Sequence, residues 1–158
     1  MTAYRNAVNY VADAMHDKWR DDRGHAPRWK EMDAESIAWL AKSPANANAV
    51  RITDKYVAEI DIAALTNSQL PPQFSGENNS AAEGAVSIVL DNPTMTTDEV
   101  ATVVHSQWVE RNASWAAAEL QVPYDQLPDV EQEKDRVIVR LALEAVEKFG
   151  LLLIQSGR

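Results

Sequence analysis

Residues 11–19 read VADAMHDKW and residues 100–108 read VATVVHSQW, so both stretches obey the pattern V-A-x-x-x-H-x-x-W without a gap. A second pair of matching segments follows in the same order, with SQLP at residues 68–71 and DQLP at residues 125–128. Similarity at two anchors in the same order indicates an internal repeat. The sequence therefore predicts an imperfect tandem duplication, with repeats over residues 1–92 and 93–158 packed as one globular unit.

Both repeats are predicted to be mainly helical. Apolar residues of the first helix recur at steps of three and four, the period of an amphipathic helix, at Tyr4, Val8, Val11, Met15 and Trp19. The counterpart helix begins with a capping box, in which Thr96 is the N-cap and Glu99 lies three residues on. Each Leu-Pro pair is expected to start a second helix, because proline fits a first turn that needs no backbone donor. Gly150 is expected to end the last helix.

The first repeat is the longer one, because it carries an insertion at about residues 24–66 between its two anchors. Within the insertion, residues 34–42 predict a short helix. Residues 50–52 and 56–62 alternate between apolar and polar side chains, which predicts a small β-hairpin. The polar segment at residues 73–80 is predicted to begin as a loop.

The composition is that of a globular protein with an acidic surface. Hydrophobic residues make up 46% and charged residues 25% of the chain, and the formal net charge is −9. Such a charge disfavours a nucleic-acid polymer as partner, although a small anion needs only a few local cations. The absence of cysteine excludes disulfides and thiolate metal sites. The sequence shows no signal peptide and no membrane span, so we expect a cytoplasmic protein with no membrane partner.

The second half resembles a known family. Residues 122–128 read VPYDQLP and residues 133–136 read EKDR, which is similar to the C-terminal part of the ryanodine-receptor repeat, or RyR domain. The HSQW at residues 105–108 is similar to the first-helix motif of the same family. Such repeats occur in pairs in calcium-release channels and singly or in pairs in bacterial and phage proteins. The resemblance covers residues 97–150 and, in the first half, only the segments 16–19 and 70–79.

The resemblance implies two long helices and a short β-hairpin per repeat, with paired repeats related by a pseudo-twofold axis. It also implies that an adenine nucleotide binds between the repeats, with one tryptophan from each first helix around the base. These tryptophans correspond to Trp19 and Trp108. The other ligand-binding residues that match the family's positions, or lie beside them, are Arg23, Asn78, Arg111, Asn112, Asp135 and Arg136.

The same residues suit a nucleotide on physical grounds. A base gains roughly 1–3 kcal/mol from each aromatic ring on which it stacks. Arg23 lies one helical turn after Trp19, where it can reach a phosphate while the ring holds the base. An asparagine such as Asn78 offers both a donor and an acceptor to a base edge or a ribose. The chain departs from the family at Asn112, which replaces a basic residue beside Arg111, and this affects phosphate contacts more than base contacts.

Each candidate residue also has a structural interpretation. Trp19 and Trp108 end apolar stripes, which is typical of core residues. His16 and His105 are expected to bond to a nearby backbone carbonyl. In the absence of a ligand, Arg23 is expected to pair with one of three carboxylates, namely Asp17, Asp21 or Asp22. The tryptophans outside the repeat motif are expected to be packing residues, namely Trp29, Trp39 and Trp115.

These observations predict a non-catalytic module that binds an adenine nucleotide, an ADP-ribose-like molecule or a cyclic nucleotide in a cleft between the repeats. With no effector domain in the sequence, binding itself would be the output, as in a phage-encoded sponge for a signalling nucleotide in the cytoplasm of a bacterium or an infected host. We expect no cofactor, no catalytic residue and no metal site, since no Gly-rich phosphate loop occurs and the spacing of His16 and His25 matches no ligand pattern.

Two alternatives remain at this point. The chain could be a protein-interaction or structural subunit in which the tryptophans belong to the core, or it could be a hydrolase of such nucleotides. The oligomeric state stays open, and a homo-oligomer is compatible with the sequence.

Overall fold

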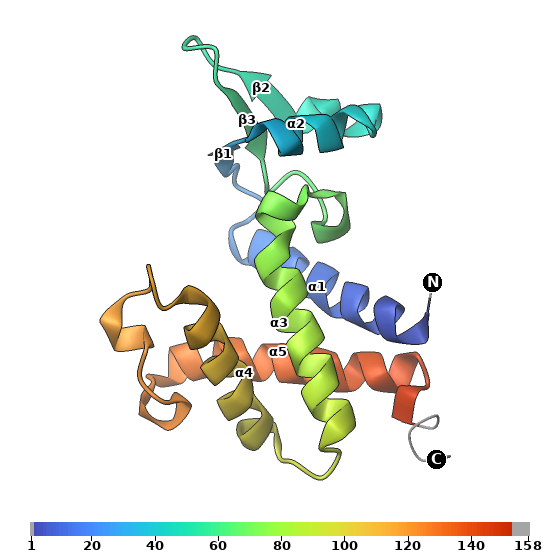
Figure 1. Cartoon of the computed structure of the whole chain (residues 1–158), viewed down its shortest axis with the longest axis vertical. Helices are drawn as coiled ribbons and strands as arrows, with labels where there is room; N and C mark the ends of the chain where they lie inside the picture. Colours follow the sequence, from blue (N-terminus) through green and yellow to red (C-terminus); the bar gives the residue numbers. More distant parts are fainter. Residues whose placement is uncertain (1, 153–158) are drawn as a thin grey trace. The chain divides into compact units, whose positions relative to one another are not determined.

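In the computed structural model, which describes residues 2–152, the chain is mainly helical and carries one small antiparallel sheet, as predicted (Figure 1). The α-helices are α1 (Ala3–Asp22), α2 (Ala34–Ala41), α3 (Pro72–Asp91), α4 (Thr97–Asn112) and α5 (Asp129–Lys148). The strands are β1 (Trp29–Glu31), β2 (Val50–Ile52) and β3 (Ala58–Asp61), and the 3₁₀ helices are η1 (Pro44–Ala49), η2 (Asn67–Gln69), η3 (Ala118–Leu120) and η4 (Tyr124–Gln126). Within residues 2–152, no helix combines the length and the apolar character needed to cross a membrane.

The contacts divide the chain into two compact units. One unit is Ala12–Asn78, and the other combines Met1–Val11 with Asn79–Arg158, so α1 and α3 contribute residues to both. This division follows contacts and not sequence similarity, so the predicted repeat boundary at residue 92 stays a prediction. The last part of the predicted second repeat, residues 153–158, lies outside the described residues.

The unit Ala12–Asn78 contains the sheet. Strand β3 lies between β1 and β2 and pairs antiparallel with both, and Ile60 of β3 lies opposite Val50 of β2. The pairing of β2 with β3 confirms the predicted hairpin, and α2 confirms the predicted short helix. Strand β1, which pairs with β3, was not predicted from the sequence.

The core of this unit lies between the sheet, α2 and the start of α3. Its buried members come from every one of these elements or their flanks, namely Met32, Leu40, Ala49, Ile60, Leu65 and Leu70, with Phe74 packed against them. Burying a side chain of the size of leucine or isoleucine contributes roughly 1.5–3 kcal/mol. Asp33 caps α2 by accepting a hydrogen bond of 2.8 Å from the backbone N–H of Ser36. The insertion is therefore a structured element, and Leu70 and Phe74, which follow it in the chain, complete its apolar core.

The second unit, Met1–Val11 with Asn79–Arg158, is built from helices whose buried side chains are small. Alanine and valine dominate the buried positions, among them Ala7, Val8, Ala82, Ala85, Val86, Val104, Val139, Ala142 and Val146. Small side chains let helix backbones approach closely, and at Gly84 of α3 an added Cβ would clash with Oε1 of Gln107 in α4. The predicted capping box at the start of α4 is present, with Thr96 accepting from the Glu99 N–H and Glu99 accepting from the Thr96 N–H.

The two Leu-Pro anchors start their helices in the same way. In each half a three-residue 3₁₀ helix (η2 or η4) precedes the leucine, and a 20-residue helix (α3 or α5) begins two residues after it. The prediction that residues 73–80 begin as a loop is wrong, because α3 starts at Pro72. Gln73, Glu77 and Ser80 are exposed on this helix, whereas Ser75 is buried and donates to the carbonyl of Pro71. Gly150 follows α5 with φ +67°, as predicted for a helix end.

Candidate functional site

Trp19 lies in the last turns of α1 and is half-buried. The ring of His16 stacks on it, with a centroid distance of 5.4 Å and an angle of 18° between the planes. The guanidinium carbon of Arg23 lies 4.8 Å from the centroid of the Trp19 ring, a cation–π contact. The structure thus brings Trp19 and Arg23 together, in the way that the one-turn spacing predicts.

His16, which stacks on Trp19, is held in place by two backbone carbonyl groups. It is buried, and its Nε2 lies 2.9 Å from the carbonyl oxygen of Ile62 and 3.0 Å from that of Leu65. Because a carbonyl can only accept, Nε2 carries the hydrogen and donates to both oxygens. This confirms the predicted carbonyl-bonded histidine, and it ties α1 to the segment that leads into η2.

Arg23 does not form the ion pair that its sequence context predicts. Lys18 pairs with Asp22, Arg20 pairs with Asp17, and His25 bonds to Asp21, so all three candidate carboxylates already have partners at helical spacing. Arg23 follows the end of α1 and donates instead to the carbonyl of Pro27 at 3.3 Å. Its guanidinium is exposed beside the indole of Trp19, with no carboxylate among the described residues bound to it.

Trp108 occupies the corresponding place in α4. It is also half-buried, and the ring of His105 stacks on it at 6.0 Å and 14°. His105 is buried, and its Nε2 donates to the carbonyl of Val122 at 2.8 Å, which again confirms the predicted type of partner. Each V-A-x-x-x-H-x-x-W motif therefore builds a buried histidine that holds a parallel tryptophan ring.

Trp115 is a member of this site that sequence analysis missed. Its ring meets that of Trp108 edge-on at 6.1 Å, and 70% of its surface is exposed. The prediction that Trp115 and Trp39 are packing residues is therefore wrong, since 42% of Trp39 is exposed as well. No periodicity marks Trp115, because it follows the end of α4 in a turn.

Asn112 lies between these two tryptophans. Its Nδ2 donates to the carbonyl of Trp108 at 2.8 Å, and its Oδ1 accepts from the indole N–H of Trp115 at 3.0 Å. The side chain is buried. Asn112 thus links Trp108 to Trp115 through two hydrogen bonds. The neighbouring Arg111, in the last turn of α4, is exposed.

Asn78 and Asp135 occupy equivalent places in α3 and α5, but their partners differ. Asn78 is half-buried and donates from Nδ2 to Oδ1 of Asn67 at 3.2 Å. Asp135 is buried, with Oδ2 at 3.5 Å from Nδ1 of His105. Burial raises the pKa of Asp135 to about 6, while the charges of His105 and Lys134 act in the opposite direction. The second motif therefore places a buried carboxyl group beside its histidine, whereas the equivalent position in α3 carries an amide.

Arg136 belongs to a network of ion pairs and hydrogen bonds formed by the first turns of α5 and by η4. It pairs with Asp129 at 2.8 Å and with Glu133 at 3.2 Å, and it donates to the hydroxyl of Tyr124 at 3.3 Å. The hydrogen bonds to Asp129 and Tyr124 raise the pKa of Arg136 above its usual range. Tyr124 is buried and donates to Asp98 at 2.7 Å, which fixes η4 against α4. Arg136 is thus engaged with carboxylates within its own unit.

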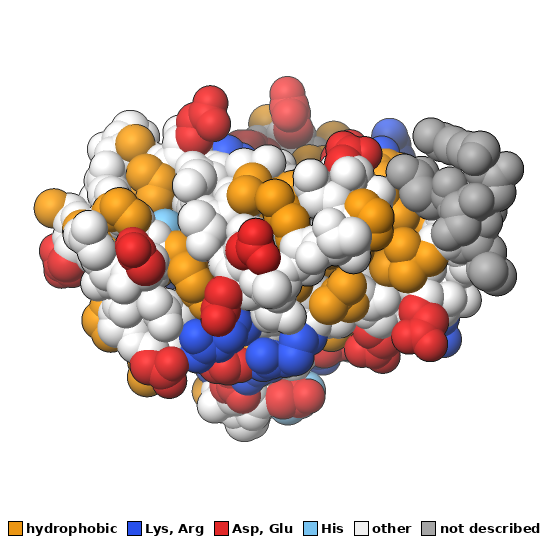
Figure 2. All heavy atoms as spheres, turned by 90° about the horizontal axis from the view of Figure 1, so that it is seen from below, with side chains coloured by type: hydrophobic (Ala, Val, Ile, Leu, Met, Phe, Trp, Pro, Cys, Tyr) orange, Lys and Arg blue, Asp and Glu red, His pale blue; other side chains and the backbone are white. Residues whose placement is uncertain are grey.

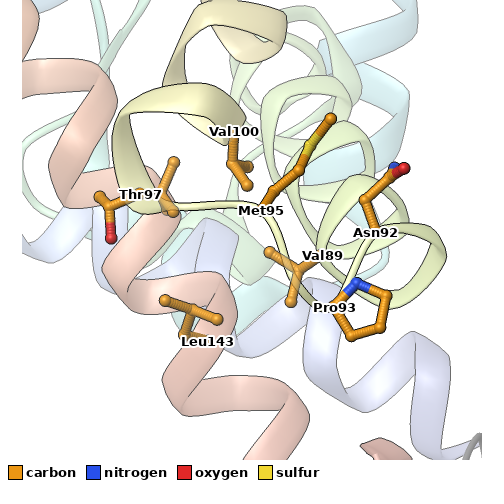
Figure 3. A pocket seen from close by; sticks show the side chains of 8 residues that line it. Val89, Asn92, Pro93, Met95, Thr97, Val100 and Leu143 are labelled. Carbon is orange, nitrogen blue, oxygen red and sulfur yellow. The ribbon is translucent and has the colours of Figure 1, made fainter.

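Trp19 and Trp108 belong to different compact units, so the cleft between the repeats stays a prediction. One pocket within a unit lies between the turn after α3, the start of α4, and α5, and Figure 3 shows seven of its lining residues labelled. It is lined mainly by apolar side chains, among them Val89, Met95 and Leu143, and its volume is about 20 Å³. That space holds about one water, so this pocket is too small for a nucleotide and contains none of the predicted ligand-binding residues.

Figure 2 shows one face of the molecule, on which several Lys and Arg side chains gather in the lower middle of the view. On the face shown in Figure 2, acidic side chains are scattered among neutral and hydrophobic ones and form no continuous patch. Among the described residues, no group of three or more His, Asp or Glu side chains is placed to hold a metal ion.

Comparisons of the chain with protein-family models, with curated proteins and with solved structures found no match. The resemblance to the RyR domain therefore rests on the motif residues alone.

Proposed function

We propose that this chain binds a nucleotide-derived small molecule without transforming it, and that Trp19 and Trp108 are the aromatic surfaces on which the base stacks. The observation that carries the proposal is the matched construction of the two sites. In each, a buried histidine is bonded to a backbone carbonyl and stacks on a half-buried tryptophan. A ring held in this way loses little conformational entropy when a ligand stacks on it, which favours binding.

Arg23 supports the same proposal. Its guanidinium lies beside the Trp19 ring, and its polar contact is with the carbonyl of Pro27, so the charge of Arg23 is not neutralised by a carboxylate among the described residues. A phosphate accepts strong, geometrically specific hydrogen bonds from a guanidinium. Stacking of the base on Trp19 with a phosphate at Arg23 uses both groups at the spacing that one helical turn provides.

The experiment is calorimetric titration with ATP, ADP-ribose and a cyclic nucleotide such as cyclic AMP. The prediction of one cleft shared by the repeats requires one ligand per chain and the loss of binding in both Trp19→Ala and Trp108→Ala. Arg23→Gln should lower the affinity for phosphorylated ligands by roughly tenfold, because a hydrogen bond to a charged group contributes about 1.5–3 kcal/mol. The affinity for adenosine, which has no phosphate, should stay the same. Tyr56→Asn, at an exposed position of the β2–β3 turn, is the control that should bind as the wild type does.

Sequestration of a signalling nucleotide is the biological role that such binding would serve. Incubation with the ligand followed by chromatography should return it unchanged. Turnover of the ligand would instead support a hydrolase and would contradict the proposal.

A structural role for the tryptophans is the second candidate. It is favoured by the engagement of Trp108 with both His105 and Trp115, and by the use of both polar ends of Asn112 within the same cluster. Under this alternative, Trp108→Ala lowers the free energy of unfolding by about 3–5 kcal/mol, as for a core tryptophan, and no nucleotide binds. Calorimetry and urea denaturation of the same variant therefore separate the two functions.

A further inference from the structure

A second pocket lies within the unit Ala12–Asn78, and none of the predicted ligand-binding residues lines it. It is formed where α2 ends, η1 begins and η2 passes, and its lining residues are Trp39, Lys42, Ser43, Asn46, Ser68 and Gln69. Its volume is about 230 Å³. Small-molecule sites typically measure roughly 300–1,000 Å³, so this pocket suits a molecule with one ring and not a dinucleotide.

One wall of the pocket presents polar groups that have no partner among residues 2–152. Trp39 is 42% exposed, and Lys42 follows three residues later on the same side of α2. Among the interactions formed within residues 2–152, none engages the indole N–H of Trp39, the ammonium of Lys42 or the carboxamide of Asn46. An aromatic face, a cation and an amide thus converge on one space with their bonding capacity available to a ligand.

The η2 side of the pocket is rigid. The hydroxyl of Ser68 donates to both carboxylate oxygens of Asp13, at 2.9 and 2.7 Å, and its backbone N–H donates to the same carboxylate at 2.8 Å. Gln69 accepts the backbone N–H of Thr66 at 2.9 Å as part of a capping box. These bonds hold Ser68 and Gln69 in place. The carboxylate of Asp13 accepts three hydrogen bonds from Ser68.

We propose that this pocket binds a small anion that carries one flat ring, with the ring against Trp39 and the anionic group at Lys42. The chain carries a net charge of −9, yet none of the six lining residues is acidic. One of them is Lys42, which forms no ion pair with any residue in the described range 2–152. The local charge therefore favours an anion where the average surface repels it. This site shares no residue with the proposed nucleotide contacts and does not rest on them.

The test uses benzoate, which carries both a ring and a charge, with benzamide and acetate as probes that each lack one of them. Binding is followed by two-dimensional NMR through the indole N–H resonance of Trp39, which is assigned with Trp39→Leu. Benzoate should shift this resonance saturably in the millimolar range or below, and benzamide and acetate should bind at least about tenfold more weakly, as expected from the loss of one charge-assisted or stacking contact. Lys42→Gln should lower the affinity for benzoate roughly tenfold and leave the affinity for benzamide unchanged.

The matched control is Lys55→Gln, which removes an exposed lysine from the β2–β3 turn of the same unit and should leave benzoate binding unaltered. The remaining amide resonances of each variant report whether the unit is folded. The proposal is overturned if benzoate produces no saturable shift at Trp39, if benzamide binds equally well, or if folded Lys42→Gln keeps the wild-type affinity.

Discussion

The Nδ1 atom of His105 lies 3.5 Å from Oδ2 of Asp135, and both side chains are buried between α4 and α5. Since Nε2 of the same ring donates to Val122, a neutral His105 carries its hydrogen there and directs a lone pair toward the carboxyl group. A hydrogen bond between Nδ1 and Oδ2 therefore requires one further proton, held by either partner. The corresponding position in α3 carries Asn78, which does not titrate.

This relationship predicts a pH-dependent stability that Asp135→Asn removes. Burial raises the pKa of Asp135 to about 6 from 3.8, so the folded state binds this proton more tightly than the unfolded chain does. The corresponding stability is fully present below about pH 4 and is lost as the pH rises through 6. Between pH 4.5 and 7.5, the wild type should therefore lose about 1–3 kcal/mol of its free energy of unfolding that Asp135→Asn does not lose.

Urea denaturation at several pH values measures that difference. Glu131 and Lys134 also act on Asp135, with opposite signs, so Glu131→Gln should shift the transition toward lower pH and serves as a check. A difference between wild type and Asp135→Asn that stays constant with pH would show that this carboxyl group does not titrate in the range.

The histidine-to-carbonyl bonds predict a second contrast in stability, between His16 and His25. His16→Ala should lower the free energy of unfolding by about 1–3 kcal/mol, because it leaves the carbonyls of Ile62 and Leu65 without their donor. The matched control is His25→Ala, which removes an exposed imidazole bonded to Asp21 and should change stability by less than about 0.5 kcal/mol. Equal effects of the two substitutions in thermal or urea unfolding would contradict the structural role of His16.

The capping box of α4 predicts a loss of about 1 kcal/mol in Thr96→Ala. Thr96→Ser keeps the oxygen that accepts from the Glu99 N–H and should restore most of the stability. Thr94→Ala, at an exposed position of the preceding turn, is the control and should be neutral. The midpoints of urea denaturation compare all three variants, and a neutral Thr96→Ala would argue against this cap.

The approach of Gly84 to Gln107 predicts coupling between α3 and α4. Alanine is favoured over glycine within a helix by about 1 kcal/mol, but its Cβ would clash with Oε1 of Gln107. Gly84→Ala should therefore be near neutral alone, since Gln107 must move, and stabilising by about 1 kcal/mol in a Gln107→Ala background. A double-mutant cycle measures this coupling, and strict additivity would show that the two residues do not interact.

Local signals in the sequence predicted much of the fold. The capping box at Thr96, the helix starts after the two Leu-Pro pairs and the β2–β3 hairpin each depend on a few neighbouring residues, so their patterns could be interpreted without a structure. The carbonyl partners of His16 and His105 were predicted by type but not by identity, because the bonded carbonyls lie 46 and 17 residues away along the chain.

The candidate site was predicted less completely. Arg23 was expected to pair with an acidic neighbour, but the carboxylates were taken by side chains at better helical spacing. Trp115 and Trp39 were expected inside, because hydrophobicity alone does not distinguish a packed indole from an exposed one. The structure changed the candidate set by adding Trp115 beside Trp108 and by placing Asn112 between them.

By itself, the sequence determined the repeated motif, the helical class and the spacing that sets a histidine three residues before each tryptophan, since a helix places such residues on one face. Only the tertiary structure decided which distant carbonyls hold those histidines, which indoles remain exposed and why Asp135 keeps its proton to a higher pH. Burial and long-range bonds depend on segments that meet only when the chain folds, and no local pattern records them.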